Sequence, residues 1–118
     1  MMERSNKYLY DILQAIVLIE DFVTNTSGYE SYLSDLKTRS AVERQLIVIG
    51  EAANAYRQLC PDNSLEELRK IVGFRNRLVH AYDAIDTSIV WAILKNHLPL
   101  LKKELQQTLN ECAEFMEK

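Results

Sequence analysis

The scarcity of glycine and proline is the feature that most restricts how this chain can fold. Three glycines and two prolines stand among 118 residues, whereas together they make up roughly 12 % of an average protein. Sheets joined by tight turns need more of both, because such turns depend on the φ angles that these residues provide. We therefore expect long helices with few connections. Sandwiches, barrels, collagen-like repeats and glycine-rich phosphate loops are excluded.

Apolar spacing locates the first two helices. Apolar residues repeat at helical intervals from Leu9 to Val23, and Ser5 is the expected N-cap. Gly28 is expected to take a positive φ where this helix ends. A short helix over Tyr29 to Ser34 should follow.

The second long helix is predicted to be the most buried. Its apolar residues are spaced alternately four and three apart from Val42 to Cys60, and its centre is apolar nearly all round. Gly50 in its middle suggests the close approach of a neighbouring helix. Ser34 and Ser40 both offer capping chemistry, so the start of this helix stays open. Glu51 is either a solvated charge or the buried partner of an arginine.

Three further helices follow a break at Pro61. A capping box at residues 64–67 opens the third helix, which runs to His80 or beyond. Asp86 caps the fourth. Pro99 disfavours helical geometry in the residue before it and fits the first turn of a last helix. The pattern predicts an all-α fold, a four- to five-helix up-down bundle, with residues 1–118 as a single domain.

Charge and cysteine content restrict function and compartment. A net charge of −3 and a pI of 5.4 argue against nonspecific coating of nucleic acid, so any such contact must be local. Cys60 and Cys112 lie far apart without other metal ligands nearby, so we expect reduced thiols, no metal and no cofactor. No apolar run approaches the roughly 18 residues that span a bilayer, and the first residues lack a signal-peptide pattern. We expect a cytoplasmic protein.

One stretch departs from ordinary helix composition. Arg69, Lys70, Arg75 and Arg77 are basic, and no acidic residue stands between positions 69 and 77. The rest of the chain carries an excess of acidic groups. A local positive surface on an acidic protein is a place for a phosphate to bind. Arg69, Lys70 and Arg77 are therefore candidates for contacting RNA phosphates.

Helical geometry groups the polar residues of this stretch. At about 100° per residue, one side of the helix carries polar residues and the other carries apolar ones. The polar set is Arg75, Asn76, His80 and Tyr82, and the apolar set is Phe74, Leu78, Ala81 and Ile85. The polar side is the candidate site.

Arginine and histidine together suit metal-independent cleavage of RNA, in which the ribose 2′-OH attacks the adjacent phosphate. Arg75 would stabilise the charge that develops on the phosphate oxygens, and His80 would transfer a proton. Such cleavage needs both an acid and a base, yet this stretch has a single histidine. A two-fold homodimer about the third helix would bring two copies of His80 together.

Structural interpretations compete with this one. A lone histidine near the end of a helix is commonly only a partner of the helix dipole, and Tyr82 could be a half-buried hydrogen-bonding residue. His97 is expected to be a helix-end residue without a catalytic role. Trp91 and the remaining tyrosines are expected in the core or at an interface.

The segment Arg75-Asn76-Arg77-Leu78-Val79-His80-Ala81-Tyr82 resembles the Arg-x4-His-x-Tyr signature of HepT-type HEPN ribonuclease toxins. Residues 49–53, 89–91 and 97–99 also resemble runs of that family, so the similarity covers essentially the whole chain. It implies an all-α homodimer with its ribonuclease site in the dimer cleft. It also implies a partner, a small MntA-type nucleotidyltransferase antitoxin.

The resemblance assigns roles by position. Arg75 and His80 match the catalytic pair, and Asn76 matches the polar position after the arginine. Tyr82 matches the tyrosine to which the antitoxin attaches AMP. The added phosphate charge and bulk beside Arg75 would block entry of RNA.

Three functions remain in competition. The first is a metal-independent endoribonuclease that acts as the toxin of a toxin–antitoxin pair. The second is a non-catalytic nucleotide-binding or regulatory subunit of a nucleotidyltransferase. The third is a helical dimer with a purely structural role.

Overall fold

The computed structural model describes residues 4–62, 65–80 and 86–117, and the side chains among them except at 75–80 and 112–117. These residues form helices without a strand. In chain order the elements are α1 (Arg4–Phe22), α2 (Tyr29–Ser34), α3 (Leu36–Leu59), α4 (Glu66–His80), α5 (Thr87–Ala92), the π-helix η1 (Ile93–His97) and α6 (Leu98–Glu117).

Helix α1 follows the predicted apolar row but differs at both ends. Ser5 is not the N-cap, because it lies inside the helix and is buried. The helix ends at Phe22, and the Val23 N–H donates to the Ile19 carbonyl at 3.1 Å. Gly28 does not adopt a left-handed conformation. Its φ of 166° is extended, and it serves as the residue that precedes α2.

Helix α2 has the predicted bounds, whereas α3 is capped by a residue that the sequence interpretation passed over. Asp35 accepts hydrogen bonds from the backbone N–H of Thr38 at 3.1 Å and from its hydroxyl at 2.6 Å. These bonds hold the pKa of the Asp35 carboxyl below its usual range. Ser34 does not cap α3, because its hydroxyl donates back to carbonyls of α2. Ser40 lies within the first turns of α3.

The centre of α3 confirms the predicted buried row, with Val42, Leu46, Ile49, Ala53 and Tyr56 all buried. Gly50 is buried as well. Glu51 is exposed, which decides in favour of the solvated charge.

Helix α4 receives its N-terminal cap from another helix. The backbone N–H of Glu67 donates to Glu104 Oε2 at 3.1 Å, and that of Leu68 donates to Oε1 at 3.1 Å. Both N–H groups belong to the first turn, where no intrahelical acceptor is available. A carboxylate at this end also interacts favourably with the helix dipole. Ser64, the predicted capping residue, lies outside the described residues.

Asp86 caps α5 as predicted, accepting from the backbone N–H of Ser88 at 3.0 Å and from its hydroxyl at 2.6 Å. The expected break before Pro99 is wrong. Leu98 is helical, with φ −62° and ψ −40°, and its N–H reaches back to the carbonyl of Ile93. This wider π-turn carries the chain past the proline, whose missing N–H would otherwise interrupt the helix. The chain therefore stays helical from α5 into α6.

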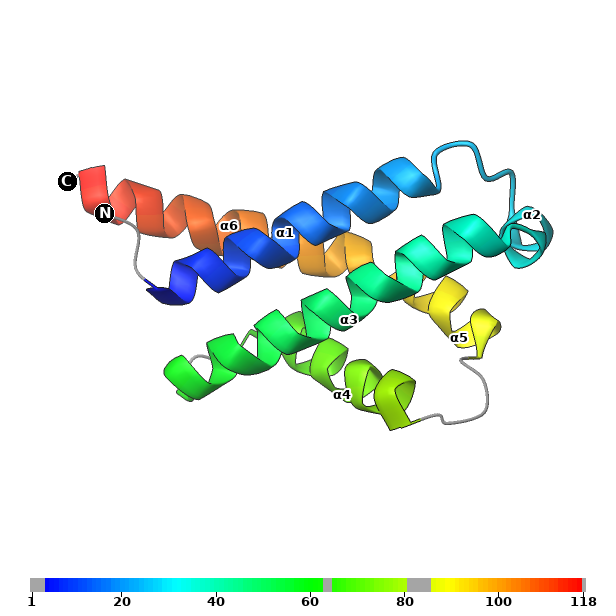
Figure 1. Ribbon diagram of the computed structural model, residues 1–118. Helices are drawn as coiled ribbons and strands as arrows, with labels where there is room; N and C mark the ends of the chain where they lie inside the picture. The colour runs from blue at the N-terminus through cyan, green and yellow to red at the C-terminus, as the bar shows by residue number, and fades with distance from the viewer. Residues whose placement is uncertain (1–3, 63–64, 81–85, 118) are drawn as a thin grey trace.

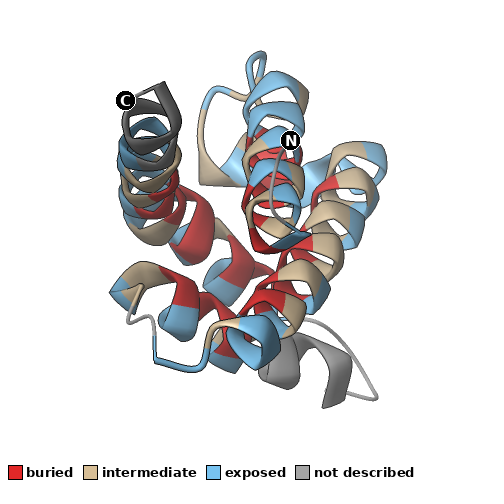
Figure 2. Ribbon diagram, turned by 90° about the vertical axis from the view of Figure 1, so that its left-hand side faces the viewer, coloured by how far each residue is buried: buried red, intermediate tan, exposed pale blue. Residues whose placement is uncertain are grey.

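The elements assemble into an all-α bundle. Figure 1 shows α1, α3, α4 and the α5–η1–α6 arm running in alternating directions across the view, as in an up-down bundle. Helix α1 packs chiefly on α3, α3 on α4, and α6 on α1 and α4. The buried stripes of the helices face one another across a single hydrophobic cluster (Figure 2). Among the helices so described, none is both long and apolar enough to cross a membrane.

The Glu104 carboxylate should contribute measurably to stability. Replacing it in Glu104→Ala leaves two part-buried N–H groups without an acceptor, so the free energy of unfolding should fall by about 2 kcal/mol. Equilibrium urea unfolding measures this change. The matched control is Glu20→Ala, which removes an exposed carboxylate of α1 that pairs with Lys102 of α6 at 2.8 Å and should cost less than about 1 kcal/mol. Equal losses in the two variants would contradict the capping role.

Candidate functional site

Helix α4 carries most of the candidate residues. Its backbone is helical through His80, so Arg75, Asn76, Arg77 and His80 all occupy positions on one continuous helix. The placement of their side chains lies outside the described structure, as does Tyr82 altogether. What the structure establishes for them is their position along and around the helix.

The described half of α4 shows which of its faces packs. Leu68, Ile71 and Val72 are buried, while Phe74, which was expected to head the apolar row, is only half-buried. Arg75 follows Leu68 by one heptad, so its position continues the buried row. This differs from the expectation that the apolar residues lie opposite Arg75.

The opposite face of α4 is open. Arg69 and Gly73 are exposed, and Asn76 and His80 continue the same row at intervals of three and four residues. Arg75 and His80 are therefore about 140° apart around the helix. Arg75 lies in line with the packed face and His80 with the open one, so a site that uses both residues must form at the boundary between the two faces.

Two of the predicted phosphate-binding residues are available on this open face. Arg69 and Lys70 are both exposed. The ammonium of Lys70 lies 3.3 Å from Glu67 Oε1, so part of its charge is balanced within the helix. A pair three residues apart on a helix surface contributes only about 0.2–0.5 kcal/mol.

An aromatic contact ties α4 to the π-turn. The ring of Phe74 lies 4.9 Å from the imidazole of His97, at an interplanar angle of 56°. The Nδ1 atom of His97 is buried and has no hydrogen-bond partner. His97 is thus not a simple helix-end residue, because it packs against the residue that directly precedes Arg75.

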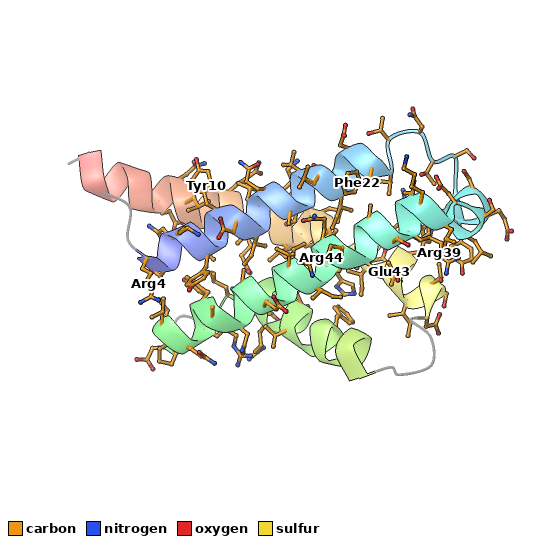
Figure 3. All side chains as sticks on the ribbon, in the orientation of Figure 1. Arg4, Tyr10, Phe22, Arg39, Glu43 and Arg44 are labelled. Atoms are coloured by element: carbon orange, nitrogen blue, oxygen red, sulfur yellow. The ribbon has the colours of Figure 1, made fainter. Side chains whose placement is uncertain are left out.

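A second polar cluster lies at the other end of α3, where Figure 3 shows Arg39 and Glu43 near α2. Arg39 Nη1 donates to the carbonyl of Leu33 at 3.1 Å. Partial burial raises the pKa of the Glu43 carboxyl, and burial likewise raises that of the fully buried Tyr32 phenol. These groups fasten α2 onto α3, and α4 contributes none of them.

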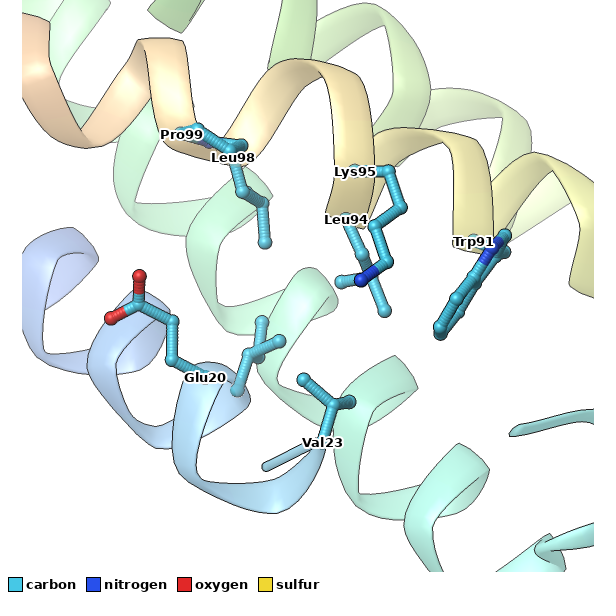
Figure 4. A pocket seen from close by; sticks show the side chains of 8 residues that line it. Glu20, Val23, Trp91, Leu94, Lys95, Leu98 and Pro99 are labelled. Atoms are coloured by element: carbon cyan, nitrogen blue, oxygen red, sulfur yellow. The ribbon is translucent and has the colours of Figure 1, made fainter. Parts of the chain in front are cut away.

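A small cavity opens between the end of α1 and the η1–α6 junction (Figure 4). Trp91, Leu94, Lys95 and Pro99 line one side of it. Lys95 Nζ lies 4.7 Å from the centre of the Trp91 ring, which in turn packs against Tyr32 at 5.1 Å. The cavity volume of about 60 Å³ holds about two water molecules. It is too small for a nucleotide, and Trp91 is a packing residue, as expected.

Metal ligands do not gather in the described part of the chain, where no three His, Cys, Asp or Glu side chains are placed to hold an ion. Two features of the site escaped the sequence interpretation. Glu104 gives no local signal, because its partners are 36 and 37 residues away. The contact of His97 depends on the π-turn, for which the only clue in the sequence is Pro99.

The fold and the site together define the class: an all-helical bundle in which one helix presents arginine, asparagine and histidine positions beside an open basic face. The chain belongs to the ribonuclease HepT-like family, whose model matches residues 12–108. That range includes the whole of α4.

Curated relatives agree with this assignment. The chain is 39 % identical over 111 residues to "Probable ribonuclease HepT" of Thermococcus cleftensis, covering 90 % of this chain and 97 % of that protein. It is 36 % identical over 103 residues to "Putative RNase MJ1380" of Methanocaldococcus jannaschii, covering 84 % and 91 %. No solved structure matches the chain at a significant level.

Proposed function

We propose that this protein is a metal-independent endoribonuclease and the toxin of a HepT/MntA-type toxin–antitoxin pair. The observation that carries the proposal is the continuous helix α4, which holds Arg75 and His80 at their signature spacing in a chain of the HepT-like family. The relatives named as ribonucleases support the same activity.

In the proposed reaction the ribose 2′-oxygen attacks the adjacent phosphorus and the bond from phosphorus to the 5′-oxygen breaks. The products are a 2′,3′-cyclic phosphate and a free 5′-hydroxyl. Arg75 stabilises the charge on the phosphate oxygens. His80 transfers a proton at one of the two reacting oxygens. Asn76 offers an amide for hydrogen bonds to the same phosphate.

The two faces of α4 suggest where this chemistry occurs. Arg75 lies in line with the packed row and His80 with the open row, so the reacting phosphate would lie at their boundary. A second copy of the chain, packed against the first about α4, would supply a second His80 as the missing acid or base. Arg69, Lys70 and Arg77 would hold the flanking phosphates.

Cleavage should depend on both residues of the pair. His80→Ala and Arg75→Ala should each lower the rate of RNA cleavage in excess chelator by about 10²–10⁴-fold, because each removes a group used in the transition state. A labelled RNA resolved on a denaturing gel measures the rate. Arg44→Ala removes an exposed arginine from α3 and should leave the rate unchanged.

Wild-type cleavage by a folded His80→Ala variant would remove His80 from the mechanism. A wild-type protein that leaves RNA intact, yet accepts AMP from a nucleotidyltransferase, would support the regulatory-subunit alternative.

The active species should be a dimer. Sedimentation equilibrium should give about twice the chain mass of 13.7 kDa, and cleavage per chain should fall on dilution below the dimer dissociation constant. A monomer that retains full activity at every concentration would contradict a site shared between two copies.

Tyr82 is the proposed point of control. An MntA-type nucleotidyltransferase would join its phenol oxygen to the α-phosphorus of ATP and release pyrophosphate. Intact-mass and peptide analysis should find AMP on Tyr82, and the modified protein should no longer cleave RNA, because the added phosphate would compete with RNA for Arg75. Tyr82→Phe should accept no AMP and should cleave RNA in the presence of the transferase. Addition only at another tyrosine, such as the exposed Tyr10, would contradict this assignment.

A further inference from the structure

Gly73 is a bare position in the middle of α4. It is exposed, and a Cβ atom built on it would meet no atom of the described residues within 4 Å. Glycine is one of the poorest residues for the interior of a helix. The packing of the described residues therefore gives no reason for glycine at this position, whereas a molecule that approaches α4 closely from outside would give one.

The positions around Gly73 indicate what approaches. On a helix, the surface neighbours of a residue are those three and four positions before and after it. For Gly73 these four neighbours are Arg69, Lys70, Asn76 and Arg77. Three of the four residues are cationic and the fourth is an amide. The bare stretch of helix backbone is therefore surrounded by residue types that bind phosphate.

The acidic residues of α4 lie to one side of this centre. Glu66 is exposed about two turns before Gly73, and Glu67, which balances part of the charge of Lys70, is mostly covered. No acidic residue follows until Asp83. The positive charge is therefore centred at Gly73 and beyond it, toward His80.

The charge of this face indicates that the molecule bound there is RNA and not a second copy of the chain. Two α4 helices crossing at Gly73 would place the arginines and lysine of one copy against the same residues of the other, and like charges repel. The sugar–phosphate backbone of RNA has the complementary charge. Dimer contacts near His80, one heptad or about 10 Å further along the helix, leave the Gly73 face to the RNA strand.

We propose that an RNA backbone phosphate, the one next to the phosphate that is cleaved, binds directly against Gly73. We call this position the phosphate seat. Without a side chain at this position, the phosphate rests directly against α4, between the helix positions of Arg69, Lys70 and Arg77. The inference depends on the proposed ribonuclease function and names the part of α4 that binds the flanking strand. Gly73 takes no part in proton transfer.

A side chain added at position 73 should affect the stability of the protein and its binding of RNA in different ways. Gly73→Ala should raise the melting temperature by about 4 °C, because alanine favours the helix and the site is open. Gly73→Gln should keep the fold but weaken binding of a fluorescently labelled 2′-O-methyl oligouridine by about tenfold. This probe lacks the attacking hydroxyl and therefore reports binding alone. The slope of log Kd against log salt should fall by about one phosphate contact.

Gly28→Gln is the matched control. Gly28 is likewise open to an added side chain, has an extended backbone and precedes α2, which packs on α3, so this variant should bind the probe as the wild type does. Arg69→Ala should weaken binding in the same direction as Gly73→Gln, and combining the two changes should cost less than the product of their separate effects.

If Gly73→Gln binds the probe as tightly as the wild type does, and the wild type cleaves RNA, the phosphate seat is overturned. The proposed ribonuclease function is then unaffected. A lower melting temperature in Gly73→Ala, or a loss of the dimer in Gly73→Gln, would place a second copy on this face and also overturn the phosphate seat. Wild-type protein that neither binds nor cleaves RNA would overturn the ribonuclease function and the phosphate seat together.

Discussion

The position of α4 depends on one carboxylate. Glu104 on α6 accepts two backbone N–H groups from the first turn of α4, at the end where the helix dipole favours negative charge. Further along, the ring of Phe74 packs on His97 of the π-turn. The α5–η1–α6 arm therefore holds α4 at two points, and α3 packs against it. Because α4 is held in this way, its rotation is defined, and so is the row of residues that it leaves open.

Because its rotation is defined, α4 has one packed face and one open face. The row through Leu68, Ile71 and Val72 is buried, and the row through Arg69 and Gly73 is open. Arg75 is in line with the first row and His80 with the second. The proposed catalytic pair is divided between a packed and an open face, which suits a site that is completed by another molecule, either RNA or a second copy of the chain.

Local rules predicted much of the fold and failed where two elements meet. The bounds of α2, the buried row of α3 and the Asp86 cap followed from spacing and capping chemistry alone. The sequence interpretation missed the N-cap of α3 because Ser34, Asp35 and Ser40 all offer capping groups near its start. Asp35 caps the helix, because the Ser34 hydroxyl bonds back to α2. The predicted break before Pro99 was wrong because the π-turn lets the helix continue, although proline has no N–H to donate. A rule about single residues does not anticipate such a rearrangement.

The sequence by itself determined that the chain forms helices, which residues α1 and α3 bury and which segment carries the motif, because helical periodicity and glycine content act over short distances. Only the tertiary structure decided how α4 is turned and capped. The Glu104 carboxylate reaches across 37 residues to Glu67, and the His97 ring reaches Phe74 through a turn whose geometry depends on packing. Such contacts depend on where whole helices lie, and no local pattern in the chain encodes that placement.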